Sequence, residues 1–139
     1  MTINKKTISK GFIIAGIMNL SVLVFSKLFT NPVIPEFDPD VMSTFGLVMI
    51  VLWGLAYVAV AKSYYKVKWL VRVFAIEKLV YVVVWIQWLL NNNLSDVFEK
   101  DILAGLFYSV YGVNDLLFCV FFTYVFLTLK NSNEDVVKV

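Results

Sequence analysis

Apolar residues gather in four long runs that are separated by short polar segments. The runs cover residues 11–29, 42–61, 69–90 and 102–129. A bilayer core is about 30 Å thick, and a helix rises about 1.5 Å per residue, so about 20 apolar residues cross it. Each run is close to or above that length. The pattern therefore predicts an all-α integral membrane four-helix bundle that forms one domain over residues 1–139.

The polar segments differ from one another in composition. Asn31–Asp40 contains three prolines and three acidic residues, and we expect an extended, solvated loop because proline opposes helix formation. Asn91–Asn93 ends the third run, and Leu94–Asp101 is a candidate for a short interfacial helix. We expect the polar tail from Lys130 onward to be frayed.

Basic residues predict the orientation of the bundle. Outside the ends of the spans, the loops after the first and third runs contain only Lys100, and Lys27 lies near the end of a span. Loops rich in lysine and arginine stay in the cytoplasm, so we expect both termini to be cytoplasmic. The N-terminal segment, the turn between the second and third runs and the tail together hold nine basic residues: Lys5, Lys6, Lys10, Lys62, Lys66, Lys68, Arg72, Lys130 and Lys138.

Composition narrows the classes of function. The chain is 60% hydrophobic and 16% charged, which leaves too little polar surface for a soluble domain. It has no histidine and a single cysteine, Cys119, so it lacks the usual haem ligand, the commonest zinc ligand and any internal disulfide. The chain has no basic stripe of the kind that binds nucleic acid, so we expect no nucleic-acid partner. We expect no cofactor and no metal.

A few polar residues interrupt the apolar runs near mid-membrane. An ionisable side chain at the bilayer centre costs at least about 2.5–3.5 kcal/mol, so its presence there indicates a structural or functional role. Counted from the cytoplasmic ends, Asn19 lies about 12 Å deep, Lys78 about 14 Å and Asp115 about 21 Å. Glu77 and Asn114 are their chain neighbours. Similar depth predicts one shared polar site in which Lys78 and Asp115 face each other.

Helical periodicity places aromatic residues on the same faces as these polar groups. Lys78, Tyr81 and Trp85 share a face of the third run, and Tyr111 and Asp115 share a face of the fourth. The predicted ligand-binding residues are Asn19, Trp53, Tyr57, Glu77, Lys78, Tyr81, Tyr111, Asn114 and Asp115. The same pattern also suits a purely structural reading, in which Lys78 and Asp115 fix helix register and the aromatic stripes pack the core.

Four short strings carry a resemblance to a known group: Ala15–Asn19, Gly54–Tyr57, Glu77–Leu79 and Gly112–Phe118. Over residues 11–130 the chain resembles the DoxX-like small bacterial membrane proteins. The resemblance implies an antiparallel four-helix bundle in a bacterial inner membrane. Some members of the group are linked to quinone-coupled sulfur oxidation, but no residue of this chain can be matched to a redox site.

Several functions fit these features. The first is binding or transport of a small amphipathic or lipid-like molecule in an intramembrane cavity. The second is a structural role, as an accessory subunit of a larger membrane complex or as a homo-oligomer. The third is a lipid-modifying, isomerase-type enzyme in which Glu77 or Asp115 acts as general acid or base; the sequence favours a non-enzymatic role. An ion or proton pathway is a further reading. Retinal attached to Lys78 does not fit a chain of four spans.

Overall fold

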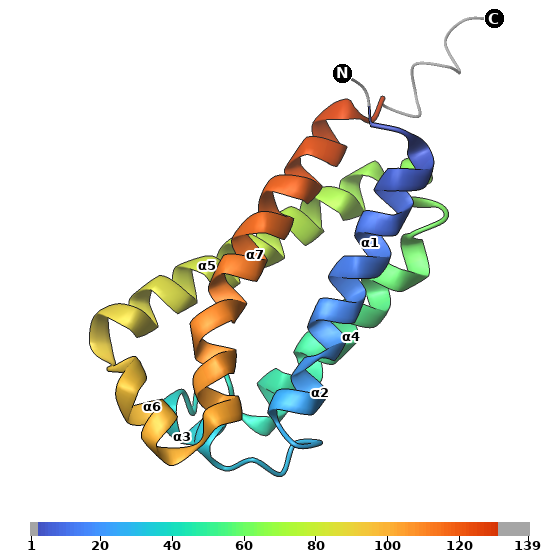
Figure 1. The fold of residues 1–139 in the computed structure, drawn as a ribbon. Helices are drawn as coiled ribbons and strands as arrows, with labels where there is room; N and C mark the ends of the chain where they lie inside the picture. Colours follow the sequence, from blue (N-terminus) through green and yellow to red (C-terminus); the bar gives the residue numbers. More distant parts are fainter. Residues whose placement is uncertain (1–2, 131–139) are drawn as a thin grey trace, which may run out of the picture.

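The structure is a computed structural model that describes residues 3–130, and within that range it contains helices and no strand (Figure 1). The tail beyond Lys130, including Lys138, lies outside the described residues, so its predicted fraying stays a prediction. The elements are α1 Lys5–Leu20, α2 Val22–Phe25, α3 Val33–Phe37, α4 Thr44–Val60, the 3-10 turn η1 Tyr64–Lys66, α5 Lys68–Asn91, α6 Leu94–Lys100 and α7 Ile102–Thr128.

Three helical segments are long and apolar enough to cross a membrane. They are Lys5–Phe25 (α1 with α2), α5 and α7, with 21, 24 and 27 residues. The remaining long helix, α4, is apolar but has 17 residues, which span about 25 Å. The four predicted runs therefore correspond to three helices of full spanning length and one slightly shorter helix. The predicted short helix after the third run is present as α6.

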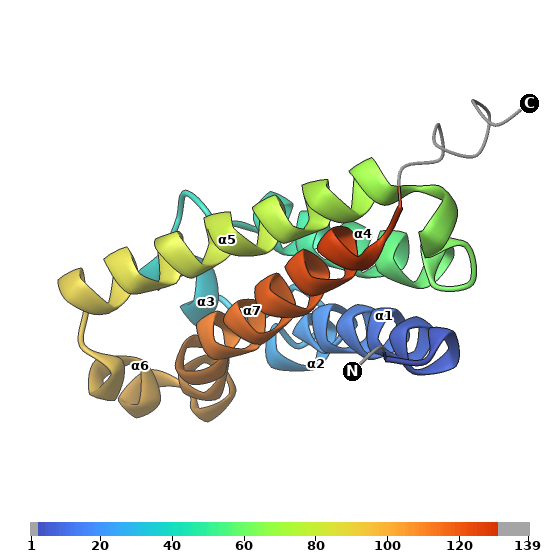
Figure 2. The same ribbon diagram turned by 90° about the horizontal axis from the view of Figure 1, so that it is seen from above.

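The long helices associate in two pairs, α1 with α4 and α5 with α7 (Figures 1 and 2). In each pair, a glycine lies where the partner helix leaves no room for a side chain. A Cβ on Gly16 would lie 2.7 Å from the carbonyl oxygen of Gly54, and a Cβ on Gly112 would lie 1.9 Å from the ring of Trp85. Small residues allow helices in membranes to approach each other closely. Each pair is thus a tightly packed unit.

Two apolar clusters fill the interior, one toward each end of the bundle. The first includes Phe12, Phe74 and Phe122, and the second includes Met42 and Trp88. The buried side chains of Asn19, Glu77, Lys78 and Asp115 come between the two clusters along the helices. The polar residues therefore form a layer at mid-height, as the similar depths predicted.

The two ends of the bundle differ in charge. α1 begins and α7 ends at one end, which we call the basic end (Figure 1). The acidic end lies opposite, at α3 and α6, and carries six carboxylates within residues 3–130. The basic end carries, among the described residues, Lys5, Lys6, Lys10, Lys62, Lys66, Lys68, Arg72 and Lys130.

The proline-rich segment departs from the prediction of an extended, solvated loop. It folds into the short helix α3, in which Ile34 is fully buried. Pro32 is the N-cap, and Pro35 lies in the first turn, where a backbone N–H has no intrahelical partner in any case. The carbonyl oxygens of Ile34 and Phe37 accept hydrogen bonds from Tyr108 Oη (2.6 Å) and Trp88 Nε1 (3.0 Å). Side chains of α5 and α7 thus hold α3 in place.

Asp101 joins three segments at the acidic end. Its Oδ1 caps α7 by accepting from the Ala104 N–H (2.8 Å) and also accepts from Asn31 Nδ2 (2.9 Å). Its Oδ2 accepts from Lys27 Nζ at 2.5 Å. The hydrogen bond from Lys27, with those from Ala104 and Asn31, lowers the pKa of the Asp101 carboxyl to about 2.

This lowered pKa predicts acid sensitivity at the acidic end. The pKa of Asp101 is lower in the folded protein than the value of about 3.9 in an unfolded chain, so its contribution to stability is complete above pH 4 or so and is lost as the pH falls toward 2. Asp101→Asn keeps a capping oxygen but does not titrate. We expect its melting temperature to fall less than that of the wild type between pH 5 and pH 2.5. Equal losses in both proteins would contradict this role.

Candidate functional site

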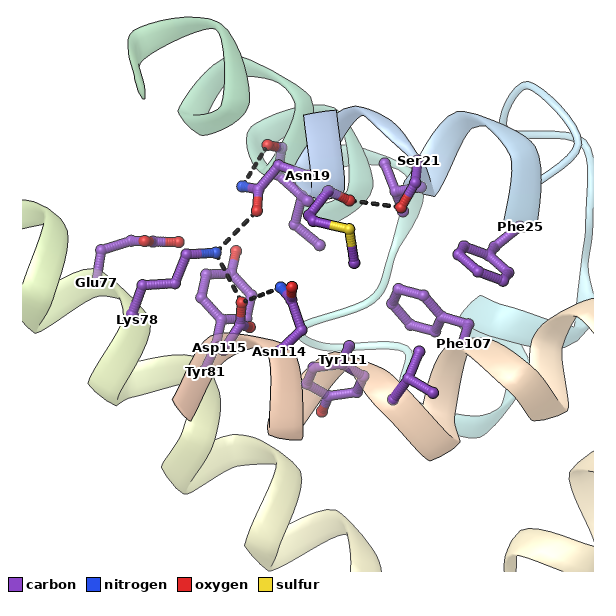
Figure 3. Close-up of a pocket in the computed structure, with 14 residues that line it drawn as sticks. Asn19, Ser21, Phe25, Glu77, Lys78, Tyr81, Phe107, Tyr111, Asn114 and Asp115 are labelled. Carbon is purple, nitrogen blue, oxygen red and sulfur yellow. Dashed lines mark hydrogen bonds and ion pairs between the residues drawn. The ribbon is translucent and has the colours of Figure 1, made fainter. Parts of the chain in front are cut away.

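Lys78 lies at the centre of the polar layer. Its Nζ donates to Asp115 Oδ1 at 2.7 Å and to Asn19 Oδ1 at 2.8 Å (Figure 3). The amide of Asn19 donates in turn to the carbonyl oxygen of Ile50 at 3.0 Å. The predicted pairing of Lys78 with Asp115 is confirmed. Because α1 and α4 form one pair and α5 and α7 the other, the Lys78–Asn19 bond joins the two pairs.

A second carboxylate lies in the same layer. The hydroxyl of Tyr57 donates to Glu77 Oε2, which adds another polar contact between the two helix pairs. The ring of Tyr57 also lies close to the ammonium of Lys78, with 5.2 Å between Nζ and the ring centroid. One lysine is therefore surrounded by two carboxylates, an amide and a tyrosine ring in a buried environment.

A cavity of about 320 Å³ adjoins this layer. Its walls come from both helix pairs. One part is polar, formed by Asn19, Lys78, Asn114 and Asp115, and the aromatic rings of Phe25 and Phe107 lie away from that cluster (Figure 3). The full lining is Met18, Asn19, Ser21, Val22, Phe25, Ile50, Glu77, Lys78, Tyr81, Phe107, Val110, Tyr111, Asn114 and Asp115. The cavity is thus amphipathic.

Two polar atoms of the lining have no partner. Among the described residues, Glu77 Oε1 and the Tyr111 hydroxyl are the buried side-chain oxygens or nitrogens that make no hydrogen bond. Glu77 is 8% exposed and Tyr111 is 7% exposed, so bulk water reaches neither well. A buried polar group without a partner costs about 1–3 kcal/mol. Both residues belong to the cavity lining, although the two oxygens themselves have almost no accessible surface.

Most of the sequence-predicted site residues meet at this cavity. Trp53 and Tyr57 do not line it: Trp53 packs on Phe74, and Tyr57 is buried in the neighbouring apolar cluster while its hydroxyl reaches Glu77. The predicted residues that do line it are Asn19, Glu77, Lys78, Tyr81, Tyr111, Asn114 and Asp115.

Several apolar and aromatic lining residues were not among those predicted from the sequence. On the first span, Val22 and Phe25 follow Met18 by four and seven residues, so the three side chains share one helical face, and that face lines the cavity. On α7 the cavity face includes Phe107 and Val110, which precede Tyr111 and Asn114 by one helical turn. That spacing of three and four residues was readable in the sequence.

Comparisons with known proteins do not identify a family for this chain. No protein-family model matches the chain, and no curated protein or solved structure matches it. The likeness to the DoxX-like group therefore stays a prediction from the four strings. Within residues 3–130, no group of three or more histidine, cysteine, aspartate or glutamate side chains is arranged to hold a metal ion.

Proposed function

We propose that this chain is an integral membrane protein that crosses the bilayer four times and binds or transports a small amphipathic molecule in its central cavity. One observation carries the proposal. An amphipathic cavity at mid-height is lined by the polar cluster around Lys78, and two of its lining residues, Glu77 and Tyr111, each have a buried oxygen without a partner. Ligand sites are typically apolar clefts of this size with a few polar anchors.

The surface supports a membrane location. Large apolar side chains are exposed along the long helices, including Ile14 and Ile17 on α1, Leu55 on α4, Val80 on α5 and Leu117 on α7. Soluble monomers rarely expose contiguous apolar surface of this extent. The charged residues of the described chain gather at the two ends, apart from the buried layer. A bilayer would cover the apolar belt between them.

Access to the cavity would come from the lipid. Met18 on α1 and Val110 on α7 both line the cavity and are 40% and 43% exposed. The mouth therefore lies between α1 and α7 on the apolar surface. An amphipathic molecule dissolved in the bilayer would enter sideways, with its polar group directed at Tyr111 and Asn114.

The proposed orientation puts the basic end in the cytoplasm, following the distribution of lysine and arginine. In a Cys119→Ser background, we expect single cysteines at Asp40 or Asn93 to react with an impermeant thiol reagent on intact cells. Cysteines at Lys62 or Lys66 should react only after the cells are opened. All four positions lie in exposed segments at the ends of the bundle. Labelling of Lys62→Cys on intact cells would reverse the orientation.

Two tyrosines on α7 give a matched test of binding. Tyr108 and Tyr111 are both buried, but only Tyr108 has a hydroxyl partner, the carbonyl oxygen of Ile34. Tyr108→Phe should cost about 1–3 kcal/mol of stability because it leaves that carbonyl without its donor. Tyr111→Phe removes a buried hydroxyl that has no partner, so it should keep or raise stability, and it should weaken ligand binding about three- to tenfold, the value of one hydrogen bond.

The probes for this test are eight-carbon chains with a hydroxyl, ammonium or carboxylate head. We expect at least one of them to raise the melting temperature of the wild type, because a ligand that binds only the folded state stabilises it. Tyr111→Phe should reduce that rise, and Tyr108→Phe should keep it. If no probe stabilises the wild type, or if both variants respond equally, the proposed binding role at Tyr111 is wrong.

A structural subunit is the second candidate. The hydrogen bonds that Lys78 already makes within the protein favour it. Asn19 and Asp115 both accept from Lys78, and Asn19 is also bonded to Ile50. Such a network joins the helix pairs without any guest. The two candidates predict different effects of a substitution that fills the cavity. A structural subunit should keep its function, and a binding protein should lose it.

A further inference from the structure

A second hollow lies on a different face from the central cavity. It has a volume of about 250 Å³ and runs between α5 and α7. It shares no lining residue with the central cavity. Its walls include Arg72, Ile76 and Leu79 from α5 and Cys119, Thr123 and Leu127 from α7. This α5–α7 groove is mostly apolar and has one cation, Arg72, at the basic end.

The cation is held at the mouth of the groove by aromatic rings. The Arg72 guanidinium carbon lies 5.7 Å from the ring centroid of Trp69 and 5.8 Å from that of Phe126. Lys68 Nζ lies 5.1 Å from the same Phe126 ring. Phe126 itself lines the groove. Two positive charges therefore flank one ring where the groove meets the basic end.

Arg72 and Lys68 form no ion pair within the described residues, so both can bind an anion. The ion pairs among residues 3–130 join Lys27 to Asp101, Lys78 to Asp115 and Lys100 to Glu36, so Arg72 and Lys68 pair with no described carboxylate. The acidic residues of the described chain lie at the acidic end or in the buried layer, and Glu77, five residues from Arg72 on α5, is buried and accepts a hydrogen bond from Tyr57.

We propose that the α5–α7 groove binds an anionic phospholipid of the leaflet at the basic end. Arg72 and Lys68 would contact the phosphate, and one acyl chain would lie along the groove. This inference rests on the membrane location proposed above, but it does not depend on the central cavity. Basic pockets between membrane helices bind anionic lipid headgroups in this way.

The dimensions suit one leaflet. Arg72 and Leu79 are seven residues apart, which corresponds to about 10 Å along α5. Leu79 follows Lys78 directly, so the groove ends at the depth of the polar layer. Half of a bilayer core is about 15 Å. An acyl chain whose phosphate lies at Arg72 would therefore occupy the groove over most of its depth.

Native mass spectrometry with two phospholipids of identical acyl chains tests the proposal. The probes are a phosphatidylglycerol and a phosphatidylcholine, titrated onto the detergent-purified protein. We expect the wild type to prefer phosphatidylglycerol. Arg72→Gln should lower that preference about fivefold, the size expected for one basic side chain near an anionic lipid surface. Lys10→Gln removes an exposed charge at the same end, on α1, and should leave the preference nearly unchanged.

A groove-filling variant separates a bound lipid from a general charge effect. Thr123→Phe keeps every charge and obstructs the groove, so it should weaken binding of both lipids. The proposal is wrong if the wild type shows no headgroup preference, or if Lys10→Gln and Arg72→Gln reduce it equally. It is also wrong if Thr123→Phe binds both lipids as well as the wild type does. These outcomes leave the central cavity untouched, whereas cysteine labelling that shows no membrane insertion would contradict both proposals.

Discussion

Replacing Lys78 by methionine is expected to cost about 3–5 kcal/mol of stability, because it leaves the Asp115 carboxylate buried without its ion-pair partner. After that change, the side-chain donor left to Asp115 among the described residues is Asn114 Nδ2, at 3.2 Å. Asp115→Leu should cost a similar amount, because Lys78 would keep only Asn19 as a side-chain acceptor. Both costs are measurable as losses in the free energy of unfolding in mixed micelles.

The double variant decides whether the two residues act as a pair. Lys78→Met combined with Asp115→Leu removes both charges and leaves no ion stranded, so it should be more stable than either single variant. Leu79→Met is a control on the same helix, at a half-exposed position, and should change stability little. A double variant that is no more stable than the single variants would show that Lys78 and Asp115 do not stabilise each other.

Filling the central cavity is expected to abolish ligand binding. Val110 lines the cavity from α7, and Val113 lies on the same helix with its side chain on the apolar surface, 49% exposed. Val110→Phe places a larger side chain at the mouth, whereas Val113→Phe makes the same change outside the lining. We expect Val110→Phe to lose the thermal stabilisation by the eight-carbon probes and Val113→Phe to keep it.

The thermal melt without probe shows whether each variant is folded. A probe at about 100 times its dissociation constant stabilises the folded state by about 2.7 kcal/mol, so its loss is easily seen. If Val110→Phe is folded and responds to the probes as the wild type does, the cavity is not the binding site.

The fold was predictable to the extent that it depends on residue periodicity and length. Runs of apolar residues locate the long helices, and the polar segments locate their ends. The path of residues 31–40 was not predictable, because it depends on tertiary contacts. Proline disfavours helix as a local rule, but hydrogen bonds from Trp88 and Tyr108 to the carbonyl oxygens of α3 stabilise a short helix there.

The polar layer was predictable because ionisable residues are costly in an apolar interior, so the few that interrupt the apolar runs are expected to meet. Their similar predicted depths indicated that Lys78 lies near Asp115 and Asn19, and in the structure Lys78 donates hydrogen bonds to both. It was harder to predict which face of each helix lines the cavity. Phe25 shares a helical face with Met18 and Val22, and these apolar side chains did not distinguish that face from one that packs against other helices. The partner of Tyr57 was also unpredictable, because adjacent positions lie about 100° apart around a helix and the sequence does not show which neighbour Glu77 meets.

Mass spectrometry of small molecules that co-purify with the protein in mild detergent tests the central claim most directly. The wild type and Val113→Phe should retain a common small amphipathic species at close to one molecule per chain. Val110→Phe should retain much less of it. If the wild type retains no such species above the level found with Val110→Phe, the cavity does not bind a small amphipathic molecule under these conditions, and the structural-subunit reading takes its place.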